Sequence, residues 1–163
     1  MRVLGVDPGT LHMGYGVLEG QDPPRLIASG TLKAATSAEV GVRLYTLYLA
    51  LEEVVRCWEP QHVAVEEPSI VAQARRSALA VGQAVGLALL VAASHSLPVA
   101  TYSPSQVKYA ITDYGRSTKE QVQQMVRLQL GLRDDLSPDA ADAVAVALCH
   151  LQALRVKALI RGA

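Results

Sequence analysis

A short apolar run that ends in a turn decides the fold of this chain: residues 1–9 read MRVLGVDPG. The run predicts a buried strand, and Asp7-Pro8-Gly9 is a turn signal that ends it. Residues 14–18 (GYGVL) are predicted to return as a second strand, and residues 26–32 as a third after the turn at residues 22–24. Three strands joined this closely predict an antiparallel meander.

After the meander, the pattern alternates between helix and strand. Capping boxes are expected to open helices at Thr36 (with Glu39), Ser103 and Ser117, and Glu59-Pro60 is expected to end the first of them. The other expected elements are a strand at 62–65, a helix at 77–93, a strand at 98–102 and a last helix from Ser137 to about Leu159. This order predicts a mixed α/β sheet with helices on both faces.

The composition indicates one globular domain that spans residues 1–163. Half of the residues are hydrophobic, which is enough for a core without disulfides or a structural metal. Fifteen basic and fifteen acidic residues cancel, so the net charge permits polyanion binding without predicting it. Cys57 and Cys149 lie in apolar helical patterns and are expected to be free, buried thiols. The absence of a secretory leader leads us to expect a cytoplasmic protein.

One segment resembles a membrane span in composition. Residues 77–93 carry no charge, but these 17 positions are fewer than a bilayer needs. We therefore expect a buried central helix and no membrane association. Within it, Ala78, Gly82 and Gly86 form a ridge of small residues, which suits either close packing on the chain's own sheet or contact with a second copy.

Four acidic residues are the candidates for chemistry. Asp7 and Glu66 each end an apolar strand run, and Asp139 and Asp142 share one face near the start of the last helix. Asp7 alone suits an ordinary turn, and Asp139 alone suits a helix N-terminus. Counting back without a gap from Gly82-Gln83-Ala84 would select Glu67 in place of Glu66. Alternation along a strand sends the two side chains to opposite faces, so only one can point at Asp7. The strand run favours Glu66.

Together, these acids predict a metal site at one edge of the sheet. The strand ends converge there, and the helix start can dock over them, since its alanines allow close approach. Hard oxygen ligands without histidine or cysteine suit Mg²⁺ or Mn²⁺. Two such ions about 4 Å apart can activate water and stabilise a leaving oxygen during phosphodiester hydrolysis.

Four motifs carry a family resemblance. They are Val3-Leu4-Gly5-Val6-Asp7-Pro8-Gly9, Val63-Ala64-Val65-Glu66-Glu67, Gln106-Val107-Lys108 and Asp139-Ala140-Ala141-Asp142-Ala143. In order, spacing and total length the chain resembles the bacterial RuvC Holliday-junction resolvases. The resemblance implies a ribonuclease H-like fold, with a five-stranded mixed sheet. It also implies a homodimer that cuts opposed strands of a four-way DNA junction symmetrically, beside the RuvA–RuvB branch-migration complex.

The resemblance also implies roles for single residues. Asp7, Glu66, Asp139 and Asp142 would be the metal-binding catalytic carboxylates, and Lys108 and Lys119 would contact DNA. Family members commonly carry aromatic residues in a loop after the glutamate, where this chain has Ile70 and contains no phenylalanine. Ile70 is expected to wedge against a base step, and Arg75 and Arg76 to contact phosphates or bases. Ordinary surface charge remains the alternative for the lysines, and a solvated helix end for the arginines.

Three other functions compete with junction resolution. An actin-like ATPase shares the opening motif, but it needs a second phosphate-binding hairpin and a longer chain. A nuclease of the same fold that acts on RNA is closer in size, although the lysine-bearing helix starts and the Asp139–Asp142 pair favour the resolvase. A non-catalytic junction-binding module is disfavoured because acids beside DNA repel phosphate unless metal is present.

Overall fold

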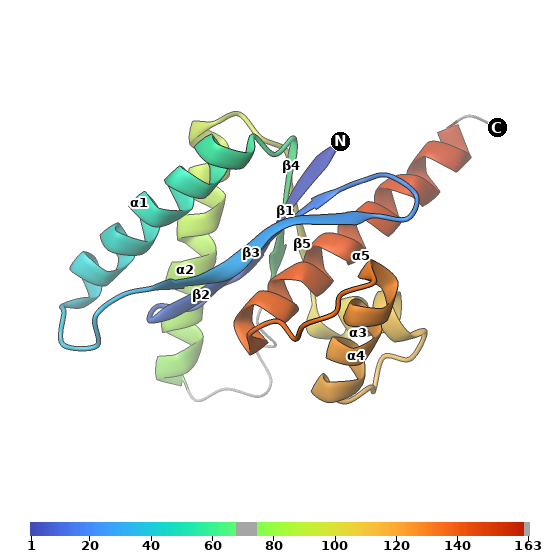
Figure 1. Ribbon diagram of the computed structural model, residues 1–163. Coiled ribbons are helices and arrows are strands. Elements are labelled where there is room, and N and C mark those ends of the chain that lie inside the picture. The colour runs from blue at the N-terminus through green and yellow to red at the C-terminus, as the bar shows by residue number, and fades with distance from the viewer. Residues whose placement is uncertain (68–74, 162–163) are drawn as a thin grey trace.

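A single mixed sheet organises the molecule (Figure 1). The computed structural model describes residues 1–67 and 75–161. Within them five strands lie in the order β3-β2-β1-β4-β5; β1 to β3 form an antiparallel meander, and β4 and β5 run parallel to β1. The strands are β1 Arg2–Asp7, β2 His12–Glu19, β3 Arg25–Lys33, β4 His62–Glu66 and β5 Val99–Tyr102. The predicted fold class is confirmed.

Helices cover both faces of this sheet. One face carries α1 and α2, and the other carries α3, α4 and α5, as Figure 1 shows. The bounds are α1 Val40–Trp58, α2 Arg75–Ser94, α3 Pro104–Thr112, α4 Lys119–Leu130 and α5 Pro138–Arg161. Each face buries its own apolar cluster, so the sheet is the shared middle layer of the domain.

Strand alternation decides which side chains face α5. On β1, Leu4 and Val6 pack in the cluster with α1 and α2, whereas Val3 packs in the cluster with α5. Since successive side chains point to opposite faces, Asp7 lies on the same face as Val3. Ala64 on β4 also belongs to the α5 cluster, so Glu66 lies on that face too. Both acids therefore face the helices that carry the other candidate residues.

The helix α5 is the apolar element that best fits a membrane span by composition. Residues Pro138–Ile160 are long and apolar enough, and an 18-residue stretch within them has a mean hydropathy of 1.6. The segment singled out from the sequence gives only a shorter apolar helix, Ala78–Ser94. Length and composition are weak indications, because the core helix of a globular domain meets the same test. Here residues 140–151 of α5 are buried, with the exception of Asp142, and α5 packs against β1 and β2.

Two of the three expected capping boxes differ from the structure. Glu39 itself occupies the N-cap of α1, without a side-chain hydrogen bond, and Thr36 lies in the preceding turn. At α4 the box is shifted by one residue to Thr118 and Gln121, because the Ser117 hydroxyl is buried and bonds Thr112 and the Tyr114 carbonyl. The box at Ser103 is confirmed. Overlapping polar residues at a helix start thus allow more than one cap.

The structure also differs from the sequence-based expectation in the burial of one cysteine and of the small-residue ridge. Cys149 is buried as expected, but Cys57 is exposed. The face of α1 that is buried contains Leu47, Leu51 and Val55, and Cys57 does not belong to it. On α2 a Cβ at Gly82 or Gly86 would meet no atom within 4 Å in the described chain. The ridge therefore does not pack on the sheet of its own chain, in contrast to one of the two alternatives.

Candidate active site

Two parallel strands bring the first pair of acids to one edge. In the ladder between β1 and β4, Val6 pairs with Val65, and Asp7 and Glu66 come next on their strands. Parallel strands end at the same edge of a sheet, so the two carboxylates lie there side by side on the α5 face. The predicted convergence of the strand ends is what the structure shows.

Close packing of α5 brings the second pair of acids to this edge. A Cβ on Gly14 would overlap the backbone of Asp139, and one on Gly5 would overlap the carbonyl of Ala143. Gly14 is the register partner of Asp7 on the neighbouring strand. The two glycines thus let the helix backbone lie directly on the sheet, with Asp139 over the position beside Asp7.

The carboxylates are close enough to perturb one another. Burial and the charges of Asp142 and Asp139 raise the pKa of Asp7 to about 7. Burial and the charges of Asp7 and Asp142 likewise raise the pKa of Glu66 to about 7. Each carboxylate disfavours ionisation of its neighbours, as expected for like charges in a partly buried site. Glu67, by contrast, is exposed, and its amide bonds the Tyr102 carbonyl at the end of β5.

A lysine ammonium already lies within this group. Lys119 Nζ is 2.5 Å from Asp142 Oδ2. Burial raises the pKa of Asp142 above its usual range, and the bond to Lys119 opposes that rise. Partial burial alone would lower the pKa of Lys119, but the hydrogen bond and charge of Asp142 together raise it. The ammonium therefore stays charged and neutralises part of the acid cluster.

A pocket of about 240 Å³ opens between these groups. Glu66, Asp142, Lys108 and Lys119 all line it. Lys108 is the fifth residue of α3 and Lys119 the first residue of α4, and Ser103 and Thr118 cap those helices. The structure thus places both predicted lysines next to two of the predicted acids, in a space with room for a phosphate group or cations.

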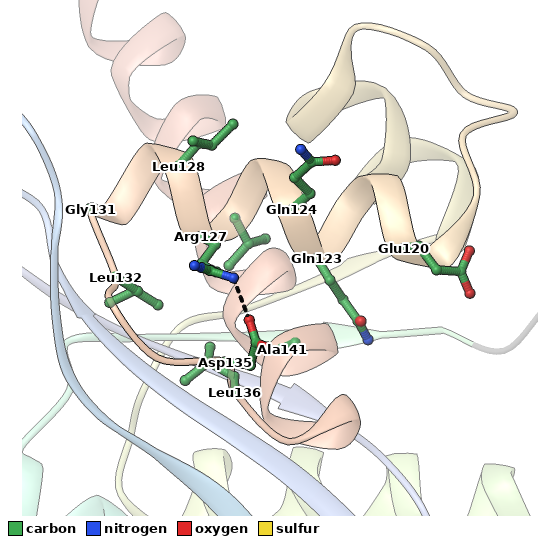
Figure 2. Close-up of a pocket in the computed structure, with 11 residues that line it drawn as sticks. Glu120, Gln123, Gln124, Arg127, Leu128, Gly131, Leu132, Asp135, Leu136 and Ala141 are labelled. Carbon is green, nitrogen blue, oxygen red and sulfur yellow. Dashed lines mark hydrogen bonds and ion pairs between the residues drawn. The ribbon is translucent and has the colours of Figure 1, made fainter.

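A larger pocket lies elsewhere, between α4 and the segment that leads into α5. Figure 2 shows this pocket of about 610 Å³, with side chains from α4 on one side and the segment before α5 on the other. None of the four acids lines it, and its Arg127 is paired with Asp135 at 2.7 Å. Size alone therefore does not mark the site; the perturbed carboxylates do.

The acid cluster fits divalent cations by its donor chemistry. Its donors are carboxylate oxygens, and the raised pKa values of Asp7 and Glu66 indicate negative charge that a cation would compensate. In residues 1–67 and 75–161, no three acidic, histidine or cysteine side chains already surround one point. Binding of one cation by this cluster would require the carboxylates to move toward a common point, and Asp142 is paired with Lys119.

Three predicted DNA contacts are not tested by the structure. Ile70 lies outside the described residues. Arg75 and Arg76 begin α2, but their side chains also lie outside what the structure describes. Sequence reasoning in turn missed Gly5 and Gly14, which admit α5 to the sheet. Their signal is glycine on the α5-facing side of strands that are otherwise apolar, opposite a helix rich in alanine.

Fold and site together define a nuclease domain of the ribonuclease H-like class. Comparison with known proteins then assigns the family: the sequence model described as "Crossover junction endodeoxyribonuclease RuvC" matches residues 3–150. The chain belongs to the RuvC family, whose members are nucleases that generally depend on divalent metal.

Individual relatives agree with this assignment. The RuvC of Dehalococcoides mccartyi is 47% identical over 152 residues, which cover 92% of this chain and 90% of that protein. The RuvC of Thermomicrobium roseum is 44% identical over 99% of both chains. Among solved structures, Thermus thermophilus RuvC in complex with a Holliday junction substrate has a TM-score of 0.89 and 36% identity over 96% of both chains. The yeast mitochondrial resolvase Ydc2, at 14% identity and a TM-score of 0.66, shares the fold.

Proposed function

We propose that this protein resolves four-way DNA junctions in recombination and repair, as a metal-dependent crossover junction endodeoxyribonuclease. Membership of the RuvC family supports the activity. The observation that carries the proposal in this chain is that Asp7, Glu66 and Asp142 come together at one edge of the sheet, beside Lys108 and Lys119. Negative and positive groups of this kind suit metal ions and the phosphates of DNA.

In the proposed mechanism, the metal would be held by Asp7, Glu66, Asp139 and Asp142. We expect two ions per site, either Mg²⁺ or Mn²⁺. The chemistry that such ions would supply is activation of a water molecule and neutralisation of charge on the departing oxygen. Asp7 and Glu66 come from fixed strand ends and supply the rigid half of the ligand set. Asp139 and Asp142 come from α5, and Asp142 must first leave Lys119.

The two lysines bind the DNA backbone in this proposal. If Asp142 held a metal ion in place of Lys119, the Lys119 ammonium would be available to bind a phosphate oxygen at the pocket. Lys108 lines the same pocket from α3 and extends the positive track. Phosphate contacts of this type position the strand without reading its sequence. Ile70, Arg75 and Arg76 are proposed to contact the junction from the segment that follows Glu66.

We propose a homodimer with two symmetric sites. The exposed face of α2 supports this: Gly82 and Gly86 leave open space, and Leu79 and Leu90 are 67% and 60% exposed. An exposed apolar face of this type suits a two-fold contact with a second copy of the chain. Partnership with RuvA–RuvB and a cytoplasmic location follow from the role in recombination and rest on the family resemblance.

Incubation with a synthetic four-way junction tests the function. The matched substrates are a linear duplex of the same sequence and an RNA hairpin, with Mg²⁺ or Mn²⁺ present. We expect paired, symmetric nicks in the junction alone. Asp7→Asn is expected to abolish cutting and to leave junction binding intact. Preferential cutting of RNA would instead support an RNA nuclease, and binding without any cutting would support a non-catalytic module.

A matched pair of variants tests the ligand role of Glu66. Glu66→Gln and Glu67→Gln make the same chemical change at neighbouring positions, but only Glu66 is close to Asp7 and Asp142. We expect Glu66→Gln to lose cleavage and Glu67→Gln to retain it. The opposite result would transfer the role to Glu67.

A further inference from the structure

Three side chains form a hydrogen-bonded chain between α5 and the two strands β4 and β5. The Tyr102 hydroxyl lies 2.7 Å from His150 Nδ1, and His150 Nε2 lies 3.2 Å from His62 Nδ1. Tyr102 belongs to β5, His150 to α5 and His62 to β4. The chain therefore ties three elements at one point inside the α5 face of the sheet.

His150 is held in this chain as a neutral ring. It is only 6% exposed, and burial together with the neighbouring His62 lowers its pKa to about 4. A neutral imidazole has one donor and one acceptor nitrogen, so His150 donates to one partner and accepts from the other. Loss of either partner would leave a buried polar atom without a hydrogen bond, which is unfavourable.

The chain is connected to the proposed metal ligands through the same elements. His62 and Glu66 lie four residues apart on β4 and on the same face, and Tyr102 is the register partner of Glu66. His150 follows Asp142 by eight residues on α5. A shift of α5 at His150 is thus passed along a rigid helix to Asp142.

No other side-chain hydrogen bond joins α5 to β4 or β5 in the described part of the chain. The remaining contacts are apolar, with alanines of α5 against the glycine and alanine positions of the sheet. Smooth apolar surfaces hold two elements together but resist sliding weakly, whereas hydrogen bonds depend steeply on distance and angle. Among the contacts that α5 makes with β4 and β5, the polar chain is therefore the one that depends most on direction and distance.

We propose that Tyr102, His150 and His62 are positioning residues for strand cleavage, which fix the separation between Asp142 on α5 and Glu66 on β4. The inference rests on the proposed function, because it concerns the geometry of that site. None of the three residues contacts substrate in this scheme; each acts through the placement of α5.

Tyr102→Phe is the most informative variant, because it removes one hydroxyl and keeps the ring. Ser94→Ala is the matched control: Ser94 donates to Glu52 at 2.9 Å in a polar group between α1 and α2, on the opposite face of the sheet. The cleavage rate of a pre-bound junction, the junction affinity and the melting temperature are measured for both. The backbone amide shift of Asp142 is followed by NMR in the metal-free protein.

We expect both variants to melt at a lower temperature, but only Tyr102→Phe to cleave about tenfold more slowly at unchanged junction affinity. The Asp142 amide is expected to shift in Tyr102→Phe and not in Ser94→Ala. A Tyr102→Phe protein with the parent rate and the parent Asp142 shift would overturn the inference, and so would an equal loss of rate in Ser94→Ala. If the parent cuts no junction, the proposed function fails, and the Asp142 shift alone decides whether the chain positions α5.

A second pair of variants tests the other end of the chain. In His62→Asn a polar side-chain atom remains near the position of Nδ1, whereas His62→Leu removes it. We expect His62→Asn to keep most of the cleavage rate and His62→Leu to lose as much as Tyr102→Phe. Equal rates in the two variants would show that His62 is not part of the positioning chain.

Discussion

The acidic residues of the site lie close enough together for their negative charges to repel one another. Asp7 and Glu66 are partly buried beside further acids, and both have a pKa near 7 rather than near 4. Lys119 pairs directly with Asp142, and its charge offsets only part of the rise in the pKa of Asp7 and of Glu66. Repulsion between these partly buried carboxylates destabilises the metal-free fold at neutral pH, and it favours the binding of a cation at the site.

Asp7→Asn is therefore expected to stabilise the metal-free protein. The folded-state pKa of Asp7 lies above its unfolded value, so the native protein loses stability as pH rises from about 4 to about 7. Asparagine carries no charge and escapes this loss, which corresponds to about 2–4 kcal/mol at pH 8. Thermal unfolding in a chelator should give the variant the higher melting temperature at pH 8 and no advantage near pH 4. A variant that is less stable than the parent at pH 8 would contradict the electrostatic account.

Lys108→Ala and Lys119→Ala are expected to weaken junction binding and to reduce its salt dependence. Each lysine that neutralises a phosphate contributes about one unit to the slope of log affinity against log salt concentration. The control is Lys157→Ala, at an exposed position 15 residues beyond Asp142 on α5. Binding titrations at several salt concentrations give the slopes. Slopes equal to the control would assign Lys108 and Lys119 to ordinary surface charge.

At the scale of elements, the site depends on how closely α5 approaches β1 and β2. The helix backbone contacts the strands where Gly5 and Gly14 lack side chains. Thr31 on β3 and Ser137, just before α5, approach to 3.2 Å and hold the helix start over the sheet. The ligands on α5 therefore reach the strand-end ligands only if the packing between these elements is preserved.

Gly14→Ala tests this dependence. Its methyl group would overlap the backbone of Asp139, so α5 must shift, and we expect a destabilisation of about 1–3 kcal/mol together with a large loss of cleavage. Gly41→Ala is the control, because a Cβ there meets nothing within 4 Å and should stabilise α1 by up to about 1 kcal/mol. Chemical denaturation and junction cleavage are measured on both. Full activity in Gly14→Ala would show that close packing at this point does not set the site.

At the scale of the whole molecule, the two faces of the sheet have different tasks. The α5 face carries the acids, the lysines and the hydrogen-bonded chain of Tyr102, His150 and His62. The other face buries one side of α2 and leaves the small-residue ridge open. We expect the junction to meet the first face and a second copy of the chain to meet the ridge.

Gly82→Lys tests the dimer. The long charged side chain would fill the open space beside the ridge, so self-association should weaken, and the two cuts in a junction should become uncoupled single nicks. Gly41→Lys introduces the same charge at an open position on α1. Sedimentation gives the oligomeric state, and a supercoiled plasmid with an extruded junction distinguishes nicking from paired cleavage. A Gly82→Lys protein that sediments like Gly41→Lys would remove the ridge from the interface.

Sequence reasoning succeeded where local pattern carries the information. The meander, the alternating helices and strands and the start of α5 at Pro138 all follow from periodicity, turns and caps. It failed by one residue at Ser117 and more widely at Thr36, because neighbouring polar residues compete for one cap. It also assigned Cys57 to the core, since an apolar neighbourhood does not say which side of a helix is covered.

The sequence by itself determined the kinds of groups available: acids at strand ends, a pair of acids at a helix start, and lysines just after capped helix starts. These depend on residues near one another in the chain. Only the tertiary structure decided that Glu66 faces Asp7 while Glu67 is exposed, that Lys119 binds Asp142, and that His150 joins α5 to the sheet. Those contacts join residues far apart in sequence, and their geometry is set by how closely the packed layers approach.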